Sequence, residues 1–487
     1  MLAGRTDCLA KVGRLAVAHG LALALSCGAC GCGTKIAQTA YKPTPENGAP
    51  VCGLTLKERL TITVIDVEDD IRYKTAGYAD FPLDERIAFS VQPNGASRVA
   101  WLDDRLTSVH VTPLNDDQMR RGADIVVPGY DLGGLVAHDD GFAILTRRDD
   151  PGEPIGDIPG GSVVAPAAFL VRVKEGHELF AAPLTGTLNI TDDPDNERRD
   201  CSTYLDGRLA YNGSKYGSYF VVRGCKGDWA DGHYGDKLVY ADDLGRHVKG
   251  GWTWRCSHDL GLRLIPEADV FTSLCISDAY PQVGTNLVIA GQPSRLLAPE
   301  VAWLGYSGAQ FGSIIKLTDN SYFASWLSRG VKDPYASPIQ AGMESHDIGF
   351  TRLSESYVPL QRPAWLSRTA DADEANLHLA PYGPDRVLVV WDSIDNPTCD
   401  GGLCLGKYGG THFRLSDTEG NFLAPEEILP APPNSADDIA VFPNGDLGWA
   451  FAAEDRSYSS TLVTVGGIPS VPPIRRISVA RLAYCSN

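Results

Sequence analysis

The stretch from Gly251 to Asp259 brings together side chains that suit the binding of a sugar. It places two indoles, Trp252 and Trp254, close along the chain to the guanidinium of Arg255 and the imidazole of His258. In an extended strand the two indoles share one face, because side chains alternate between faces. Aromatic faces stack on sugar rings, and the polar tips beside them donate hydrogen bonds. This stretch therefore predicts a carbohydrate site.

The same residue types suit one reaction, β-elimination in a uronate polysaccharide. That reaction needs a cation on the uronate carboxylate, a base of pKa near about 7 for the C5 proton, and an acid for the leaving oxygen. Arg255, His258 and a tyrosine, either Tyr240 or Tyr216, supply these three roles in a lyase hypothesis. The alternative is structural: the stretch is then a turn of a repeated unit, in which the histidine caps a strand end.

Further polar and aromatic residues precede strands that the sequence predicts to lie at the centre of the fold. Loops at one end of a ring of strands are where ligands usually bind. His346, in a related Ser-His-Asp sequence, belongs to the same candidate set. The other candidates are Tyr130, Asp131, Tyr211, Asn212, His258, Asp259, Tyr306, Gln310, Asn376, His378, Asp437 and Asp438.

Metal and cofactor signals are weaker. Asp192, Asp193 and Asp195 crowd oxygen ligands into a short loop, which suits calcium, although a solvated acidic insertion gives the same pattern. The sequence has no nucleophile elbow, HExxH, phosphate-binding loop or dinucleotide fingerprint, so we expect no other cofactor. The formal net charge of −18 argues against nucleic acid or an anionic membrane surface as the general partner.

A repeated hairpin positions these residues. From Leu54 onward a short apolar strand, a turn of Gly, Asn, Asp or Pro, and a second apolar strand recur, which is typical of β-hairpins. The second strand opens at Val99, Phe142, Phe220, Phe271, Phe323, Val387 and Leu447. Between these copies, second hairpins begin at Phe169, Lys237, Gly349 and His412.

Two hairpins per repeat make a four-stranded blade, and the sequence therefore predicts an all-β propeller of about seven blades. The first strand (60–67) and the last (477–482) are expected to pair and close the ring. A pair of β-sandwiches or a β-helix is the alternative. Across residues 54–485 the chain resembles secreted bacterial β-propellers in general, without the repeated Gly-His and Trp-Asp marks of WD-repeat blades.

The cysteines indicate disulfides in an exported chain, because an even number of them remains after the N-terminal ones are set aside. Spacing favours four pairs, and eight cysteines allow many other pairings. The favoured pairs are Cys52 with Cys485, Cys201 with Cys225, Cys256 with Cys275, and Cys399 with Cys404. The first of these would lock the ring closure.

The N-terminus predicts export. Residues 1–26 read as a signal peptide with a basic start and a short apolar run, although a buried helix of the mature fold is the alternative. Cleavage after Ser26 leaves Cys27 first, so lipid anchoring through Cys27 stands beside plain secretion. Residues 27–51 read as a flexible tether and residues 52–487 as one propeller domain.

Taken together, these patterns predict an exported protein, periplasmic, anchored to the outer membrane or extracellular. The first expectation is a propeller that binds a carbohydrate or another envelope component at its loop end. The uronate lyase and a structural or protein-interaction propeller of the envelope are the alternatives.

Overall fold

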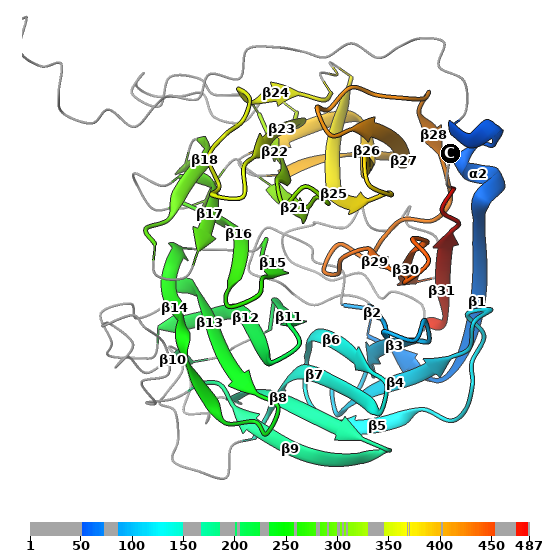
Figure 1. The fold of residues 1–487 in the computed structure, drawn as a ribbon, viewed down its shortest axis with the longest axis vertical. Coiled ribbons are helices and arrows are strands. Elements are labelled where there is room, and N and C mark those ends of the chain that lie inside the picture. The colour runs from blue at the N-terminus through cyan, green and yellow to red at the C-terminus, as the bar shows by residue number, and fades with distance from the viewer. Residues whose placement is uncertain are drawn as a thin grey trace, which may run out of the picture. The chain divides into compact units, whose positions relative to one another are not determined.

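A computed structural model describes most of the chain as a ring of antiparallel sheets (Figure 1). The described residues are 51–485 without 73–85, 150–166, 186–199, 202–204, 225–232, 258–260, 279–282, 290–291, 300–301, 304–305, 308–309, 330–344, 368, 370, 401–402 and 453–473. Seven blades of four strands follow one another in this part of the chain. The predicted seven-bladed β-propeller is therefore confirmed.

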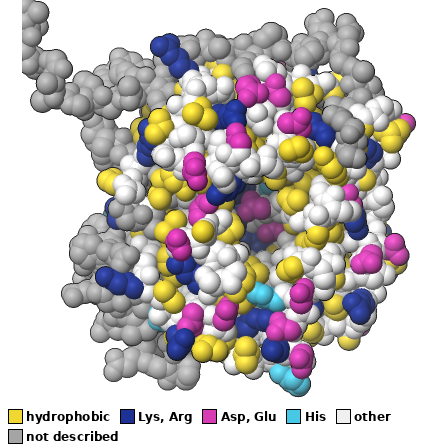
Figure 2. Space-filling view, viewed as in Figure 1, with side chains coloured by type: hydrophobic (Ala, Val, Ile, Leu, Met, Phe, Trp, Pro, Cys, Tyr) yellow, Lys and Arg dark blue, Asp and Glu magenta, His cyan; other side chains and the backbone are white. Residues whose placement is uncertain are grey.

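Each blade runs from an innermost strand at the centre of the ring to an outermost strand at the rim (Figure 1). The hollow at the centre of the ring, visible in Figure 2, is called the channel below. The innermost strands are β2 (Ala88–Val91), β6 (Leu132–His138), β11 (Gly207–Tyr211), β15 (Arg263–Pro266), β21 (Gln310–Lys316), β25 (Ala372–Pro381) and β29 (Ala440–Val441). The second strands are β3 (Ser97–Leu102), β7 (Gly141–Arg148), β12 (Lys215–Gly224), β16 (Phe271–Ser277), β22 (Tyr322–Ser328), β26 (Arg386–Asp400) and β30 (Leu447–Ala452).

The outer half of each blade completes the sheet. The third strands are β4 (Ser108–Leu114), β8 (Ala167–Lys174), β13 (Tyr234–Asp242), β17 (Gly284–Ile289), β23 (Asp347–Leu353), β27 (Leu403–Asp417) and β31 (Ile474–Leu482). The outermost strands are β5 (Ile125–Pro128), β9 (His177–Pro183), β14 (His247–Ser257), β18 (Arg295–Pro299), β24 (Ala364–Trp365), β28 (Glu427–Ile428) and β1 (Leu60–Ile71). Short strands β10 (Asp200–Cys201), β19 (Ala302–Trp303) and β20 (Tyr306–Ser307) are additional.

The seven hairpins predicted from the sequence are the inner strand pairs of the seven blades. In some of their turns a side-chain oxygen accepts backbone N–H groups that have no partner across the hairpin. Asn94 Oδ1 accepts the N–H of Ala96 at 2.9 Å, and Asn444 Oδ1 accepts that of Asp446 at 3.1 Å. Local turn chemistry thus helps to set the start of β3 and of β30.

The ring closes between the two ends of the described chain. Strand β1 pairs antiparallel with β31, with Leu60 opposite Leu482 and Ile65 opposite Ile477, as predicted. The predicted disulfide between Cys52 and Cys485 is present, with Cα atoms 6.2 Å apart. It joins the 3₁₀ turn η1 (Val51–Gly53) to the residues that follow β31.

A short helix, α2 (Leu56–Arg59), leads from this disulfide into β1. Thr55 caps it, because its side chain accepts the N–H of Glu58 at 3.2 Å. The carboxylate of Glu427 in β28 accepts the N–H groups of Leu56 and Lys57 at 2.6 and 3.0 Å. Helix α2 is therefore hydrogen-bonded to the neighbouring blade.

Hydrophobic clusters fill the interfaces between blades. Among the described residues there are seven, and each draws buried side chains from two adjacent blades. Trp101 and Ile477, for example, meet where the closing blade contacts the first. Burying one large apolar side chain stabilises the folded state by about 1.5–3 kcal/mol. The packing of neighbouring blades against each other therefore contributes a large part of the stability of the fold.

Three further disulfide predictions concern the remaining cysteines. The Cys256–Cys275 disulfide is present, inside the core. Cys404 is disulfide-bonded, and Cys399 lies opposite it in the β26–β27 register. For the pair Cys201–Cys225, Cys225 lies outside the described residues and the side chain of Cys201 is not described.

Several expectations fall outside the described residues. They are the signal peptide (1–26), most of the tether (27–51) with Cys27, the acidic loop at Asp192, Asp193 and Asp195, and the pair His258 and Asp259. In the described part of the chain, no helix has the length and apolar character needed to span a membrane.

Candidate functional site

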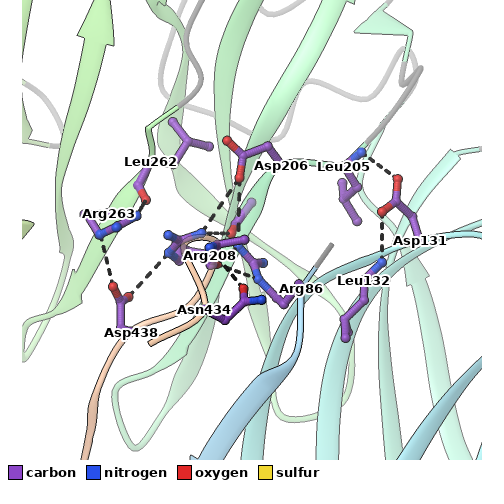
Figure 3. A network of polar contacts seen from close by, with 12 residues as sticks. Arg86, Asp131, Leu132, Leu205, Asp206, Arg208, Leu262, Arg263, Asn434 and Asp438 are labelled. Carbon is purple, nitrogen blue, oxygen red and sulfur yellow. Dashed lines mark hydrogen bonds and ion pairs between the residues drawn. The ribbon is translucent and has the colours of Figure 1, made fainter. Parts of the chain in front are cut away.

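Three arginines from three blades meet at one end of the channel, where innermost strands begin (Figure 3). Arg86 lies two residues before β2, Arg208 is the second residue of β11, and Arg263 is the first residue of β15. All three are buried, with 3%, 5% and 2% of their surfaces exposed. Buried arginines are rare unless they are paired, so this channel-end arginine cluster requires anions.

Two aspartates supply part of that negative charge (Figure 3). Asp438 places Oδ1 at 3.1 Å from Arg263 Nε and Oδ2 at 3.4 Å from Arg208 Nε. Asp206 Oδ1 lies 3.8 Å from Arg208 Nη1 and 3.9 Å from Arg86 Nη2. The Asp438 side chain is 45% exposed, so the cluster is reached by solvent on the side of Asp438.

The segment 433–438, which leads into β29 of the closing blade, contributes Asp438 and its neighbour Asp437. Arg86 Nε donates to the carbonyl of Ala436 at 2.6 Å, and the Asp437 carboxylate accepts the N–H of Phe89 at 2.8 Å. Asn434 lies beside the guanidinium groups in Figure 3. This segment therefore joins the last blade to the first at the cluster. Figure 2 shows a hollow at the middle of one face of the ring, with acidic side chains inside it.

Burial and mutual repulsion perturb the titration of the cluster. Burial, and after it the charge of Arg208, lowers the pKa of Arg86 to about 10. Burial likewise lowers the pKa of Arg263 to about 10, with Arg208 again opposing its charge. Burial raises the pKa of the Asp437 carboxyl to about 6 although Arg86 favours its ionised form. An additional anion would relieve the repulsion among the arginines.

The cluster has donors that no described group satisfies. Arg86 Nη1 and Arg263 Nη2 are buried without a hydrogen-bond partner, and so is the acceptor Asp206 Oδ2. An unsatisfied buried polar group costs about 1–3 kcal/mol, and more when it is charged. A ligand with an anionic group and a hydroxyl matches these donors and this acceptor.

The Gly251–Asp259 stretch is placed differently from its prediction. Trp252 is buried at the interface with the next blade, whereas Trp254 contacts the cluster at the opposite interface. The two indoles therefore lie on opposite faces, and the expectation of a shared face is wrong. The cause is local: Trp254 has a φ of 56°, and β14 is bulged against β13.

A buried carboxylate organises this stretch as core structure. Asp236 accepts from Trp252 Nε1 at 2.7 Å and from the N–H groups of Arg255 and Cys256 at 2.6 and 2.7 Å. Burial raises the pKa of Asp236, and these bonds oppose the rise. Tyr240 is also buried, with its ring centroid 5.3 Å from that of Phe271. Trp252 and Tyr240 are therefore core residues, closed to a substrate.

Tyr211 and Asn212 lie at the other end of β11 from the arginine cluster, in its turn to β12. Asn212 Oδ1 accepts the N–H of Ser214 at 3.1 Å and shapes that turn. Tyr211 contacts His138 and Tyr216, and Tyr216 OH lies 2.8 Å from His138 Nε2. These residues form a separate polar group. The expectation that Tyr211 and Asn212 precede an inner strand is wrong.

The two remaining predicted histidines are buried. His378 Nε2 lies 2.9 Å from Asn376 Oδ1, inside β25. His346 Nδ1 lies 2.7 Å from Asp373 Oδ1, close to Cys404. These three side chains are near enough to share a metal ion, but Cys404 is disulfide-bonded and offers no thiolate. Tyr306 and Gln310 lie in β20 and β21, and their side chains are not described.

Glu374, the neighbour of Asp373, carries a testable pH dependence. Burial, with the charges of Asp347 and Asp373, raises its pKa from 4.5 to about 9. A raised folded-state pKa means that its contribution to stability is complete below about pH 4.5 and is lost progressively up to about pH 9. We expect Glu374→Gln to raise the free energy of unfolding by about 2–3 kcal/mol at pH 7 and to leave it unchanged at pH 4.5. Urea unfolding at both pH values measures this, and equal curves at pH 7 would contradict it.

The sequence identified two acidic residues at the channel-end arginine cluster but none of its three arginines. Asp437 and Asp438 were candidates. Asp131 was another candidate, but its carboxylate is paired with Arg147 at 2.9 Å. Arg86, Arg208 and Arg263 were not candidates. The signal that finds them is the recurrence of an arginine at the start of three inner strands.

No protein-family model matches the chain, and no curated protein matches its sequence. Several solved structures are weakly similar to the chain. A polysaccharide lyase named Uly1 aligns over 87% of this chain and 99% of its own, with 9% identity and a TM-score of 0.43. The GH93 α-L-arabinofuranosidase of Fusarium graminearum, in complex with arabinobiose, aligns over 86% and 97%, with 10% identity and a TM-score of 0.40.

A protein of unknown function from Dyadobacter fermentans aligns over 87% of this chain and 100% of its own, with 11% identity and a TM-score of 0.38. Similarity this weak does not identify a ligand or a reaction. The chain is a seven-bladed β-propeller, and its function has to be argued from its own residues.

Proposed function

We propose that this protein is an exported β-propeller that binds an acidic carbohydrate at the channel-end arginine cluster. The observation that carries the proposal is the pair of unsatisfied buried donors, Arg86 Nη1 and Arg263 Nη2. Guanidinium groups bind carboxylates through paired, charge-assisted hydrogen bonds. A uronate carboxylate is the ligand group that suits them.

One aspartate of the cluster, Asp206, favours a sugar over a simple anion. Its Oδ2 is a buried acceptor without a hydrogen-bond partner. Carboxylates accept hydrogen bonds from sugar hydroxyls. With a formal charge of −18, the protein has no general attraction for polyanions, so recognition depends on this local group of cations.

Export is part of the proposal. Disulfides persist in oxidising compartments, and two are described here, Cys52–Cys485 and Cys256–Cys275. An extracytoplasmic location also places the protein among polysaccharides.

The experiment is a binding titration of the purified full chain with polygalacturonate and with its methyl ester. The two polymers share the sugar ring, and the ester lacks the charge. We expect the free acid to bind, with an affinity that falls as salt rises, and the ester to bind at least 30-fold more weakly. Equal affinity for both polymers would overturn the carboxylate assignment. No binding to any acidic polysaccharide would favour a structural or protein-interaction role.

Elimination in a uronate polymer is the second candidate. Asp437 favours it, because a carboxyl of pKa about 6 beside Arg86 exchanges a proton near neutral pH. In this form of the hypothesis the arginines neutralise the uronate carboxylate, in place of Arg255. New unsaturated ends absorb in the ultraviolet, so following absorbance during the same titrations separates a lyase from a binding protein.

A further inference from the structure

The disulfide that closes the ring lies in unusual surroundings. Cys52 is exposed and Cys485 is half-buried, so an external thiol approaches this disulfide from the side of Cys52. The Cys256–Cys275 disulfide differs, because both of its cysteines are buried in the core between two blades. The same chain therefore carries an accessible and a protected disulfide.

Two buried arginines face the accessible disulfide. Arg59 Nη1 lies 3.1 Å from Cys485 Sγ. Arg386 Nη1 lies 3.7 Å from Cys485 Sγ and 3.8 Å from Cys52 Sγ, and its Nη2 donates to the Cys485 carbonyl at 2.9 Å. Both guanidinium groups also lie over the ring of Tyr382, which fixes their positions.

The charges of these arginines are weakly balanced. The carboxylate facing Arg386 is that of Asp385, 3.5 Å away, and its side chain is 71% exposed and therefore screened by solvent. Asp446 nearby is paired with Arg481 at 2.8 Å. Tyr382 between the arginines stays a neutral phenol, because burial raises its pKa. The sulfur of Cys485 thus lies in a positive environment.

A positive environment stabilises a thiolate and makes a disulfide easier to open. Cysteine pKa values fall beside arginine, and a thiol of lower pKa is the better leaving group in thiol–disulfide exchange. An incoming thiolate therefore attacks the exposed Cys52, and Cys485 leaves.

We propose that Cys52–Cys485 is a thiol–disulfide exchange site for an extracytoplasmic dithiol reductant. The thiolate of the reductant forms a bond to Cys52 Sγ while the bond between the two cysteine sulfurs breaks, and Cys485 departs as a thiolate held by Arg59 and Arg386. The second thiol of the reductant then displaces Cys52, which takes up a proton. The protein disulfide gains two electrons, and the reductant is oxidised to its own disulfide.

Opening this bond removes the covalent link between η1 and the end of β31. The β1–β31 pairing remains, so the ring is held by hydrogen bonds and side-chain contacts alone. The disulfide is separate from the proposed carbohydrate site, whose three arginines lie at or just before the start of inner strands in other blades.

The test follows each disulfide of the folded full chain during treatment with dithiothreitol, by alkylation and peptide mass spectrometry. We expect Cys52–Cys485 to open at least 10-fold faster than Cys256–Cys275. With glutathione as the attacking thiol, the mixed disulfide should form on Cys52. Equal opening rates for the two bonds, or an adduct found mainly on Cys485, would overturn the proposal.

Accessibility alone also speeds opening, so charge variants test the arginines. Arg386→Gln removes the charge and should slow opening about 3- to 10-fold, whereas Arg386→Lys keeps the charge and the rate. Arg172→Gln, which removes a similarly buried arginine from β8 in another blade, is the matched control and should leave the rate unchanged. Should Arg386→Gln fail to fold, Arg59→Gln replaces it, because Arg59 Nη1 lies 3.1 Å from Cys485 Sγ, and an unchanged opening rate in that variant counts against the proposal.

Discussion

Replacing both Cys52 and Cys485 by serine is expected to lower the free energy of unfolding by about 4–6 kcal/mol. The disulfide closes a loop with a sequence separation of 433 residues, so it removes a large conformational entropy from the unfolded chain. The folded ring keeps its β1–β31 pairing, and the loss therefore arises mainly in the unfolded state.

Denaturant unfolding of the serine variant without reductant measures this loss. The matched control is the natural chain with Cys52–Cys485 selectively reduced and alkylated, which should unfold at a similar denaturant concentration. A loss below about 1 kcal/mol would mean that strand pairing alone holds the ring and that the disulfide adds little.

The fold could be predicted because each blade has a local sequence pattern that identifies its inner hairpin. Alternating apolar strands and turn residues such as Asn94 and Asn444 mark the inner hairpins without knowledge of distant contacts. The closure of the ring was predicted from one further assumption, that the first and last strands belong to the same blade. The pairing of Leu60 with Leu482 confirms this prediction.

The candidate site was only partly predictable, because it depends on contacts across the channel. Arg86, Arg208 and Arg263 are far apart along the chain, and each alone looks like a strand residue with a solvated side chain. Only the ring brings their guanidinium groups together at Asp206 and Asp438. A pattern of residue types cannot reveal a convergence of this kind.

The prediction for the stretch around Trp252 was wrong because of local backbone geometry, and not because of distant contacts. Its residue types suggested a sugar site, and the strand period suggested a common face, but a bulge and a positive φ at Trp254 turned the two indoles to opposite faces. Bulges break the two-residue period on which such reasoning depends. The buried carboxylate of Asp236 then accepts hydrogen bonds from the polar groups of this stretch, so those groups serve the core and not a ligand.

Two substitutions in the arginine cluster are expected to change uronate binding in opposite directions. Arg263→Met removes an unsatisfied buried donor and a positive charge, and should weaken binding of polygalacturonate about 1000-fold, since losing one partner of a buried charged hydrogen bond costs about 4 kcal/mol. Arg414→Met is the matched control, because Arg414 is a similarly buried arginine in another blade, over the ring of Phe422.

Asp438→Asn should instead tighten binding about 5-fold. Asp438 holds its carboxylate against Arg208 and Arg263, so it competes with a ligand carboxylate for the same cations, and asparagine removes that charge while keeping the shape. Asp139→Asn changes the net charge equally at an exposed position at the far end of β6, and should leave affinity unchanged. Misfolding weakens binding, so a gain in affinity at Asp438 cannot come from a damaged fold. Calorimetric titration of the four variants with polygalacturonate measures these affinities. Weaker binding by the Asp438 variant would contradict the prediction and mean that this carboxylate accepts hydrogen bonds from the hydroxyl groups of the ligand.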